Sequence, residues 1–405
     1  MAARSIRLFL TLCLLAAPWG KICWAQEAPT DFTVSETIFR RLDRAQKALE
    51  KKNYQGAHAA LDELKNRKNL SNYERALMWQ TRSYIYVSQN ELGPAGEAMT
   101  EALSLNALPP DAELSMRFNL GQVLLANDRP KKSLQQFKVW ASKAQRPSAD
   151  SLYTVAVAHA QAKSPAGAVQ FIDRALRAKK DPPENWYRLK LAAHVRLEQW
   201  GPAIRVMAGL VEKKRQDHAG WKQLSALYAQ ANRTSESVAT LELAFRLGLL
   251  TEEKDIRLLA QNLMASGLPL KSAEVIEAGM KKKLFPRSPG NLELLGKAYV
   301  GASARSRAVA PLEAAAKAKK DGRLYAELGR IHMAEKQWAK ASSALSRALS
   351  LGGLRQPGQT YVMLGMARHQ QQKPGEARKA FQAALKFDNS RRTAESWLKF
   401  IAGEG

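Results

Sequence analysis

Cysteine is almost absent from this sequence of 405 residues, as are other features on which whole classes of protein depend. The two cysteines, Cys13 and Cys23, both lie in the first 25 residues, so a chain without that segment has no disulfide and no thiol nucleophile. No later apolar run approaches the ~20 residues of a membrane-spanning helix. β-Branched residues are sparse beside alanine, leucine and lysine, which predicts helix and almost no strand.

Acidic residues are also scarce. The chain has 63 Lys and Arg against 37 Asp and Glu, a formal net charge of +26. With 45% apolar residues it can bury more than one core, or one continuous core built of repeats. The excess of positive charge favours an anionic partner.

Residues 1–25 have the pattern of a secretory signal peptide. Arg4 and Arg7 precede a short apolar stretch, and Cys23-Trp24-Ala25 ends the segment before Gln26. We therefore expect cleavage near Gln26, a mature protein in the periplasm and no transmembrane span in it. A retained N-terminal anchor is the alternative. Cleavage would leave 60 basic and 37 acidic residues, a net charge of +23.

One pattern recurs ten times along the rest of the chain. It is clearest where an aromatic residue, Trp338, stands three residues before Ala341, with Leu345 four residues after. The small residue that marks each copy is Ala57, Ala95, Ser133, Ala168, Ala203, Ser237, Ser272, Ala308, Ala341 or Ala377. Twelve residues upstream stands another small or apolar residue: Ala45, Ser83, Gly121, Ala156, Leu191, Ser225, Ala260, Gly296, Gly329 or Gly365. We interpret the two positions as the close crossing of two paired helices.

With this period of 33 to 38 residues, the chain resembles the tetratricopeptide repeat family. The resemblance implies an all-α fold, a right-handed superhelical solenoid of about ten helix-turn-helix repeats over residues 36–390, after a linker at 26–35. Residues 391–405, which place Trp397, Leu398 and Ile401 on one helical face, would form the capping helix and tail. A generic alanine-rich bundle would lack the long fixed period.

Several residues mark expected helix ends. Expected starts are at Ser71 with Glu74 in capping-box spacing, at Asp181-Pro182 and at Ser288-Pro289. Expected ends are at Gly248 and at Gly352-Gly353.

Motifs for catalysis are missing. The sequence has no HExxH, no glycine-rich phosphate loop and no GxSxG. His159, His194 and His332 occupy a repeat position that elsewhere holds tyrosine, so we expect them to pack rather than to bind metal. We therefore expect a protein that is not an enzyme and binds no cofactor or metal.

The positive charge falls in two kinds of place. Runs such as residues 177–180 and 280–283 end the second helices of repeats, where cations offset the helix dipole and stay solvated. The family resemblance implies that first-helix residues line a concave groove that binds the partner. Its aromatic and polar zone would comprise Gln80, Tyr84, Phe118, Asn119, Gln122 and Tyr153. Its basic zone would comprise Arg188, Arg196, Lys222, Lys254, Arg257, Lys297, Arg323 and Arg330, against only Glu293 and Glu327. This imbalance predicts a protein partner with an acidic or C-terminal carboxylate segment.

Three stretches, residues 72–86, 242–280 and 352–381, and the ending at 395–401 resemble periplasmic tetratricopeptide proteins that accompany TonB–ExbB–ExbD energy-transducing systems. That resemblance implies a non-catalytic accessory that docks envelope proteins. A scaffold for exopolysaccharide export or peptidoglycan assembly, binding an acidic polysaccharide, is the alternative. Nucleic acid is not expected as a partner because the N-terminal segment directs export.

Overall fold

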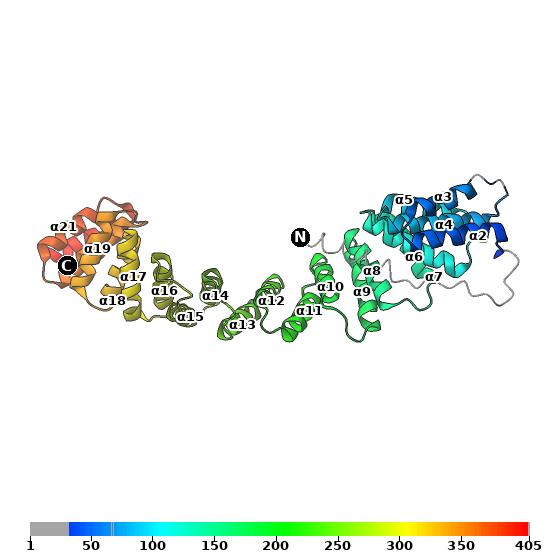
Figure 1. Cartoon of the computed structure of the whole chain (residues 1–405). Helices are drawn as coiled ribbons and strands as arrows, with labels where there is room; N and C mark the ends of the chain where they lie inside the picture. The colour runs from blue at the N-terminus through cyan, green and yellow to red at the C-terminus, as the bar shows by residue number, and fades with distance from the viewer. Residues whose placement is uncertain (1–31, 66, 68, 404–405) are drawn as a thin grey trace. The chain divides into compact units, whose positions relative to one another are not determined.

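The computed structural model describes residues 32–65, 67 and 69–403 of the chain, and they form helices only (Figure 1). The prediction of an all-α fold is therefore confirmed. The chain divides into two compact units, Met1–Leu210 and Val211–Gly405. The predicted signal peptide and most of the predicted linker lie outside the described residues.

Both units consist of helices joined by short turns. The first unit contains α2 (Glu36–Glu50), α3 (Tyr54–Lys65), α4 (Asn72–Ser88), α5 (Leu92–Ser104), α6 (Pro110–Ala126), α7 (Pro130–Lys143), α8 (Ala149–Gln161), α9 (Pro165–Ala178) and α10 (Glu184–Arg196). The division between the units falls within α11 (Trp200–Lys213). The second unit contains α12 (His218–Gln230), α13 (Thr234–Arg246), α14 (Glu253–Ala265), α15 (Pro269–Lys281), α16 (Pro289–Gly301), α17 (Arg305–Lys319), α18 (Gly322–Ala334), α19 (Trp338–Leu351), α20 (Pro357–Gln370), α21 (Pro374–Ala384) and α22 (Asp388–Ile401).

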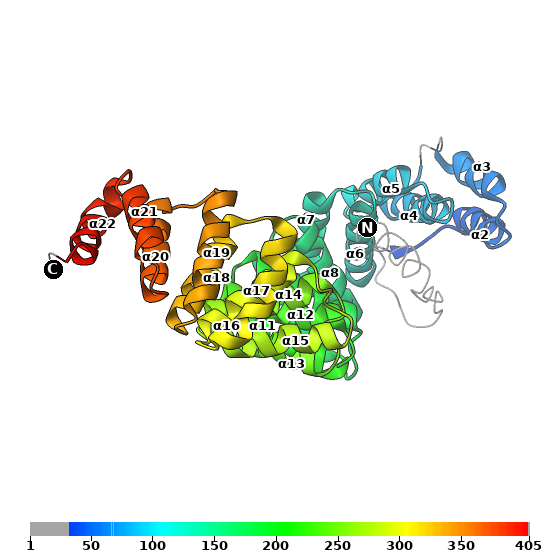
Figure 2. The same ribbon diagram turned by 90° about the vertical axis from the view of Figure 1, so that its left-hand side faces the viewer.

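The helices pack in consecutive pairs. In the first unit α2 packs against α3, α4 against α5, α6 against α7 and α8 against α9; in the second the pairs run from α12–α13 to α20–α21. The last helix, α22, has no partner of its own and packs on α20 and α21, where Figure 2 shows it at the C-terminal end. Trp397, Leu398 and Ile401 lie against the buried Phe381 cluster, as expected of a capping helix.

The predicted close crossings are present in the structure. All ten small residues of the repeat are at most 4% exposed, and all ten residues twelve positions upstream are buried as well. Some of these pairs are joined directly: the Ser133 hydroxyl donates to the Gly121 carbonyl at 2.6 Å, and the Ser272 hydroxyl donates to the Ala260 carbonyl at 2.8 Å. The twelve-residue spacing therefore marks the contact between paired helices.

Where the upstream residue is glycine, a large side chain of the second helix covers it. A Cβ atom built on Gly296 would lie 2.4 Å from Leu312, and one on Gly365 would lie 2.5 Å from Phe381. Leu312 and Phe381 each stand four residues after the small residue of their repeat and are fully buried. In these repeats the large apolar residue therefore requires a small partner sixteen residues earlier, whereas the repeat with Leu191 and Met207 buries two larger side chains.

A left-handed residue closes the turn within every repeat. It lies five residues before the small position: Lys52, Asn90, Asp128, Lys163, Glu198, Asn232, Gly267, Ser303, Lys336 or Gln372, with φ between 54° and 73°. The following N–H then bonds back to a carbonyl of the first helix, as Ser164 N does to His159 O at 2.8 Å and Gln337 N to His332 O at 2.8 Å. This is the Schellman type of helix ending, made with glycine at one repeat only.

Two predicted helix starts are confirmed and one is wrong. Ser71 and Glu74 form the capping box, and Ser288 caps the helix that begins at Pro289. The start expected at Pro182 falls instead at Glu184, with Pro183 as the capping residue. A residue that precedes proline avoids the helical conformation, so Pro182 cannot begin a helix before Pro183.

Glu74 ties the first helix pair to the second. Its buried carboxylate accepts hydrogen bonds from Ser35 N at 3.0 Å, Ser35 Oγ at 2.8 Å and Ser71 N at 2.9 Å. Ser35 and Ser71 are the residues that cap α2 and α4. Burial raises the pKa of Glu74, but these hydrogen bonds outweigh it and hold the pKa below its ordinary value.

We expect Glu74→Gln to lower the stability of α2 by about 1.5 kcal/mol at neutral pH, because charge-assisted hydrogen bonds are lost. Since the folded-state pKa is depressed, this stabilisation is present above the unfolded-state pKa and is lost as the pH falls through the folded-state pKa. Amide hydrogen exchange in α2, measured against pH, tests both points. Glu36→Gln, at an exposed residue of α2, is the control. Equal exchange in both variants would contradict the role of Glu74.

Candidate partner-binding surface

The aromatic and polar residues predicted for the groove lie on α4, α6 and α8 of the first unit. Tyr84 accepts a hydrogen bond from Gln80 Nε2 at 3.2 Å, and Asn119 is partly exposed. The Phe118 ring packs on α7, with its centroid 4.8 Å from that of Trp140, and Gln122 is only 6% exposed. Tyr84 and Asn119 therefore offer surface to a partner, whereas Phe118 serves packing within its repeat and Gln122 offers little.

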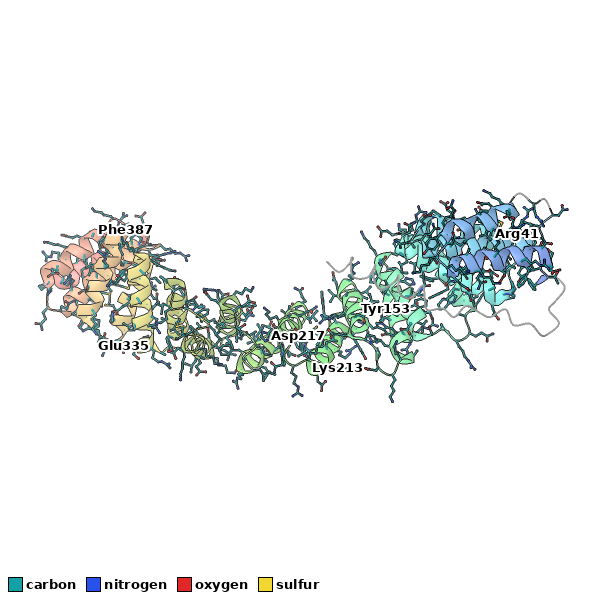
Figure 3. All side chains as sticks on the ribbon, in the orientation of Figure 1. Arg41, Tyr153, Lys213, Asp217, Glu335 and Phe387 are labelled. Carbon is teal, nitrogen blue, oxygen red and sulfur yellow. The ribbon has the colours of Figure 1, made fainter. Side chains whose placement is uncertain are left out.

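Tyr153 joins two successive repeats. Its ring stacks on Trp186 of α10 at 4.7 Å, and its hydroxyl accepts a hydrogen bond from Asn185 Nδ2 at 3.0 Å. Burial raises the pKa of Tyr153, so this phenol stays neutral. Figure 3 labels Tyr153 on α8. Tyr153 is only partly exposed and therefore offers limited surface to a partner.

The two basic residues predicted on α10 differ in their surroundings. Arg188 is about half exposed and donates to Glu184 Oε1 at 2.6 Å, one helical turn earlier. Arg196 is exposed, and no carboxylate of the described residues lies within ion-pair distance of it. Only Arg196 of this pair keeps an uncompensated charge.

The predicted basic residues of the second unit all pair with carboxylates. Lys222 Nζ lies 3.0 Å from Asp255 Oδ2, Lys254 Nζ 2.6 Å from Glu252, Lys297 Nζ 2.5 Å from Glu293 and Arg323 Nη2 2.8 Å from Asp321, while Arg330 pairs with Glu327. The ion pairs with Lys254 and Arg323 hold the pKa values of Glu252 and Asp321 below their ordinary range. These cations are therefore largely neutralised within the unit, contrary to the expected imbalance.

Arg257 belongs to a network that joins α14 to α16. It donates to Glu253 at 2.5 Å and to the fully buried Asn291, and its guanidinium lies over the Phe285 ring at 5.5 Å. Asn291 in turn donates to Glu253 at 3.0 Å and to the Pro286 carbonyl at 2.8 Å. Arg257 thus has a structural role, whatever it contributes to binding. The role of the predicted groove residues in binding a partner stays a prediction.

Most basic residues at the ends of second helices are exposed, and two of the lysines also lie near aromatic rings. Lys179 Nζ lies 2.9 Å from Asp150 and 5.0 Å from the centre of the Trp186 ring, and Lys282 Nζ lies 5.6 Å from the centre of the Phe245 ring. Trp186 belongs to α10 and Phe245 to α13, so both lysines approach rings of other helices.

The three histidines serve the repeat turns. His194 Nδ1 lies 2.8 Å from Gln199 Oε1, His332 Nδ1 lies 2.9 Å from Gln337 Oε1, and the ring of His159 stacks on Phe171. Burial lowers the pKa of His159. Within the described residues, no three or more histidine and acidic side chains gather as metal ligands would.

Comparison with known proteins identifies the repeat. Residues 358–391, which span most of α20 and α21 and the start of α22, match the family model of the tetratricopeptide repeat. No curated protein matches the chain in sequence. The chain therefore contains a tetratricopeptide repeat, and the other helix pairs share its buried crossing and its turn. Helices α2–α22 include none with the length and apolar character that crossing a membrane requires.

Several crystal structures are similar to the chain. A tetratricopeptide repeat protein from Parabacteroides merdae is 14% identical over 65% of this chain and 99% of its own, with a TM-score of 0.37. The C-terminal part of a repeat-containing protein from Cytophaga hutchinsonii is 12% identical over 60% of this chain and 98% of its own, with a TM-score of 0.36. MamA from Desulfovibrio magneticus is 19% identical over 43% of this chain and 97% of its own, with a TM-score of 0.35.

Proposed function

We propose that this protein is a non-catalytic scaffold that binds other proteins through the surfaces of its helix pairs. The observation that carries the proposal is the repetition of one crossing, buried in all ten copies and including the copy that matches the tetratricopeptide repeat. An array of stacked repeats does not close around a single cavity. It presents an extended surface along the repeats instead. Binding of a protein segment along that surface is the activity that this architecture supports best.

We further propose that the scaffold works in the periplasm as an accessory of a TonB–ExbB–ExbD type of system. The support for this is in the sequence: Arg4 and Arg7 before an apolar stretch, and the stretches that resemble such accessories. A mature chain without cysteine suits an oxidising compartment, because it cannot form wrong disulfides there.

One experiment tests both levels of the proposal. The native protein is cross-linked in living cells and purified from the periplasmic fraction, its intact mass is measured, and the attached proteins are identified. We expect an N-terminus at Gln26 or within a few residues of it, and cross-links to envelope proteins that include TonB-, ExbB- or ExbD-like subunits. A retained Met1 would contradict export by cleavage. Cross-links to other proteins only would contradict the TonB-type assignment, and the absence of any cross-linked protein would contradict the scaffold.

A further inference from the structure

The C-terminal part of the second unit has a face without acidic residues. No aspartate or glutamate occurs between Glu335 and Glu376, a run of 40 residues. The Glu376 carboxylate forms ion pairs with Arg368 and Lys373: Oε2 lies 2.9 Å from Arg368 Nη1, and Oε1 lies 3.8 Å from Lys373 Nζ. We define the acid-free face by the exposed basic residues that remain: Lys336, Lys340, Arg347, Arg355, Arg378, Lys379 and Lys386.

The acid-free face differs in its charge balance from the predicted groove. Among the described residues, none of its seven cations has a carboxylate within ion-pair distance, whereas each predicted groove cation of this unit has one. Neighbouring like charges without counter-charges raise the energy of the free protein. A bound anion relieves that repulsion, so the electrostatic gain from binding is larger here than in the groove.

Helical periodicity places four of these cations on the exposed sides of α19 and α21, and Lys336, Arg355 and Lys386 lie in the connections between helices. The buried residues of α19 are Ala341, Ser342, Leu345 and Ala348, and its exposed stripe is Lys340, Ser343, Arg347 and Ser350. The buried residues of α21 are Ala377, Ala380, Phe381 and Ala384; beyond the paired Glu376 its exposed residues are Arg378, Lys379 and Gln382, and Lys386 follows the helix. Lys340 and Arg347 are about 10 Å apart along the helix axis, at ~1.5 Å per residue.

One pair of hydrogen bonds places the start of α21 beside α19. Gln371 Nε2, in the turn before α21, donates to the Trp338 carbonyl and to Ser342 Oγ of α19, both at 2.9 Å. A Cβ atom built on Gly358 would meet Ser390 Oγ at 2.2 Å, so the start of α20 also lies against the first turn of α22. Figure 3 labels Glu335, just before Lys336, and Phe387, just after Lys386. The last two repeats therefore carry the acid-free face on packed helices.

The character of the acid-free face disfavours several classes of ligand. The exposed uncharged residues of α19 and α21 are alanine, serine, glutamine, proline and glycine, and none of the large exposed apolar side chains of the described chain lies on these helices. A helix that inserts into a bilayer surface needs apolar side chains, and single-stranded nucleic acids need exposed aromatic rings. A second copy of this chain fits poorly because its own net charge is +26. A polypeptide rich in aspartate and glutamate meets the face with carboxylates, which arginine binds by two parallel hydrogen bonds.

We propose that the acid-free face of α19 and α21 is the docking surface for an acidic polypeptide segment of a partner protein. This inference rests on the proposed scaffold function and places its binding surface on second helices rather than in the predicted groove. Binding should weaken with salt, because exposed charges are screened beyond ~8 Å at physiological ionic strength.

The test compares two charge reversals that change the net charge equally. The face variant is Lys340→Glu/Arg347→Glu/Lys379→Glu. The control variant is Lys281→Glu/Arg287→Glu/Arg305→Glu, at exposed residues of the same unit that lack ion pairs among the described residues. Binding of fluorescein-labelled poly-L-glutamate of about 20 residues to the full chain is measured by anisotropy. We expect the face variant to bind at least about tenfold more weakly than wild type, and the control variant less than about threefold.

Parallel measurements separate the other outcomes. Circular dichroism should give wild-type helicity for both variants. Equal losses in the two variants, or no saturable binding by wild type, would overturn the proposal. Polygalacturonate, a 20-base-pair DNA and phosphatidylglycerol vesicles are tested in the same way. The proposal would also be overturned if one of them bound to wild type more tightly than poly-L-glutamate and the face variant no longer bound it. In-cell cross-linking of the two variants separates a failure of this docking surface from a failure of the scaffold function. Unchanged protein cross-links in the face variant would refute the docking surface and leave the scaffold function intact. A wild-type chain without any cross-linked protein would refute the scaffold function.

Discussion

Gly322→Ala should destabilise the α18–α19 pair by about 3 kcal/mol. A Cβ atom built on Gly322 would lie 2.3 Å from the Gly352 carbonyl oxygen and 2.8 Å from that of Ala348. Both are backbone atoms, and the end of α19 is fixed by Gly352 and Gly353 in positive-φ conformations, so no side chain can turn away to make room. Overpacking costs about 1–3 kcal/mol where side chains can yield, and more where the backbone must shift. Alanine gains at most ~1 kcal/mol over glycine from helix propensity, so the clash dominates.

Gly290→Ala is the matched control for this prediction. Gly290 lies in the first turn of α16, in the same unit, and a Cβ atom there would meet nothing within 4 Å. The same substitution should therefore leave stability unchanged or raise it by about 0.5 kcal/mol. Urea unfolding followed by circular dichroism, together with amide exchange in α18, measures both variants. Similar midpoints for the two would mean that α19 does not end against Gly322.

The period and the crossing of the repeat could be predicted from the sequence because few residue types satisfy them. A fully buried helix contact accepts only glycine, alanine or serine at its narrowest point, so those residues recur at fixed intervals and are easy to recognise. The turn was harder to predict. Its left-handed residue is Asn90, Asp128, Asn232 or Gly267 in four repeats, types that favour this conformation, but six repeats have other residues there. There the preceding helix and the crossing impose the conformation and outweigh the local propensity.

The prediction of an excess of positive charge in the groove did not include the ion pairs that its cations make. A count of basic and acidic residues does not record which of them lie close together in the fold. Part of the pairing was visible in the sequence: Glu253 and Glu293 stand four residues before Arg257 and Lys297, the spacing of helical ion pairs. The pair of Lys222 with Asp255 was not, because these residues are 33 apart and meet only when successive first helices are placed side by side. Conversely, the 40-residue run without acidic residues is visible in the sequence. Its meaning for the surface could be judged only once the structure showed which residues of each helix are exposed.

The pairing rule between the two helices predicts a rescue. Gly365→Ala should cost about 2 kcal/mol, because its Cβ atom would lie 2.5 Å from the Phe381 ring. Trp397 of α22 stacks on the same ring, with the two ring centroids 5.4 Å apart, and restricts its movement. Phe381→Leu alone should cost about 1–2 kcal/mol through the smaller buried side chain. The double variant, however, recreates the combination found at Ala45 and Leu61, both fully buried, where alanine faces leucine at the same spacing.

We therefore expect Gly365→Ala/Phe381→Leu to be destabilised by about 1 kcal/mol, well below the ~3–4 kcal/mol of the two single changes added together. Urea midpoints of the wild type, both single variants and the double variant close the cycle, with amide exchange in α20 and α21 to locate the change. The favourable coupling of about 2 kcal/mol would come from relief of one steric overlap, because neither residue carries a charge or a hydrogen-bonding side chain. If the double variant lost the full sum, the crossing would not depend on the match between these two positions, and the glycines at Gly121, Gly296 and Gly329 would need another explanation.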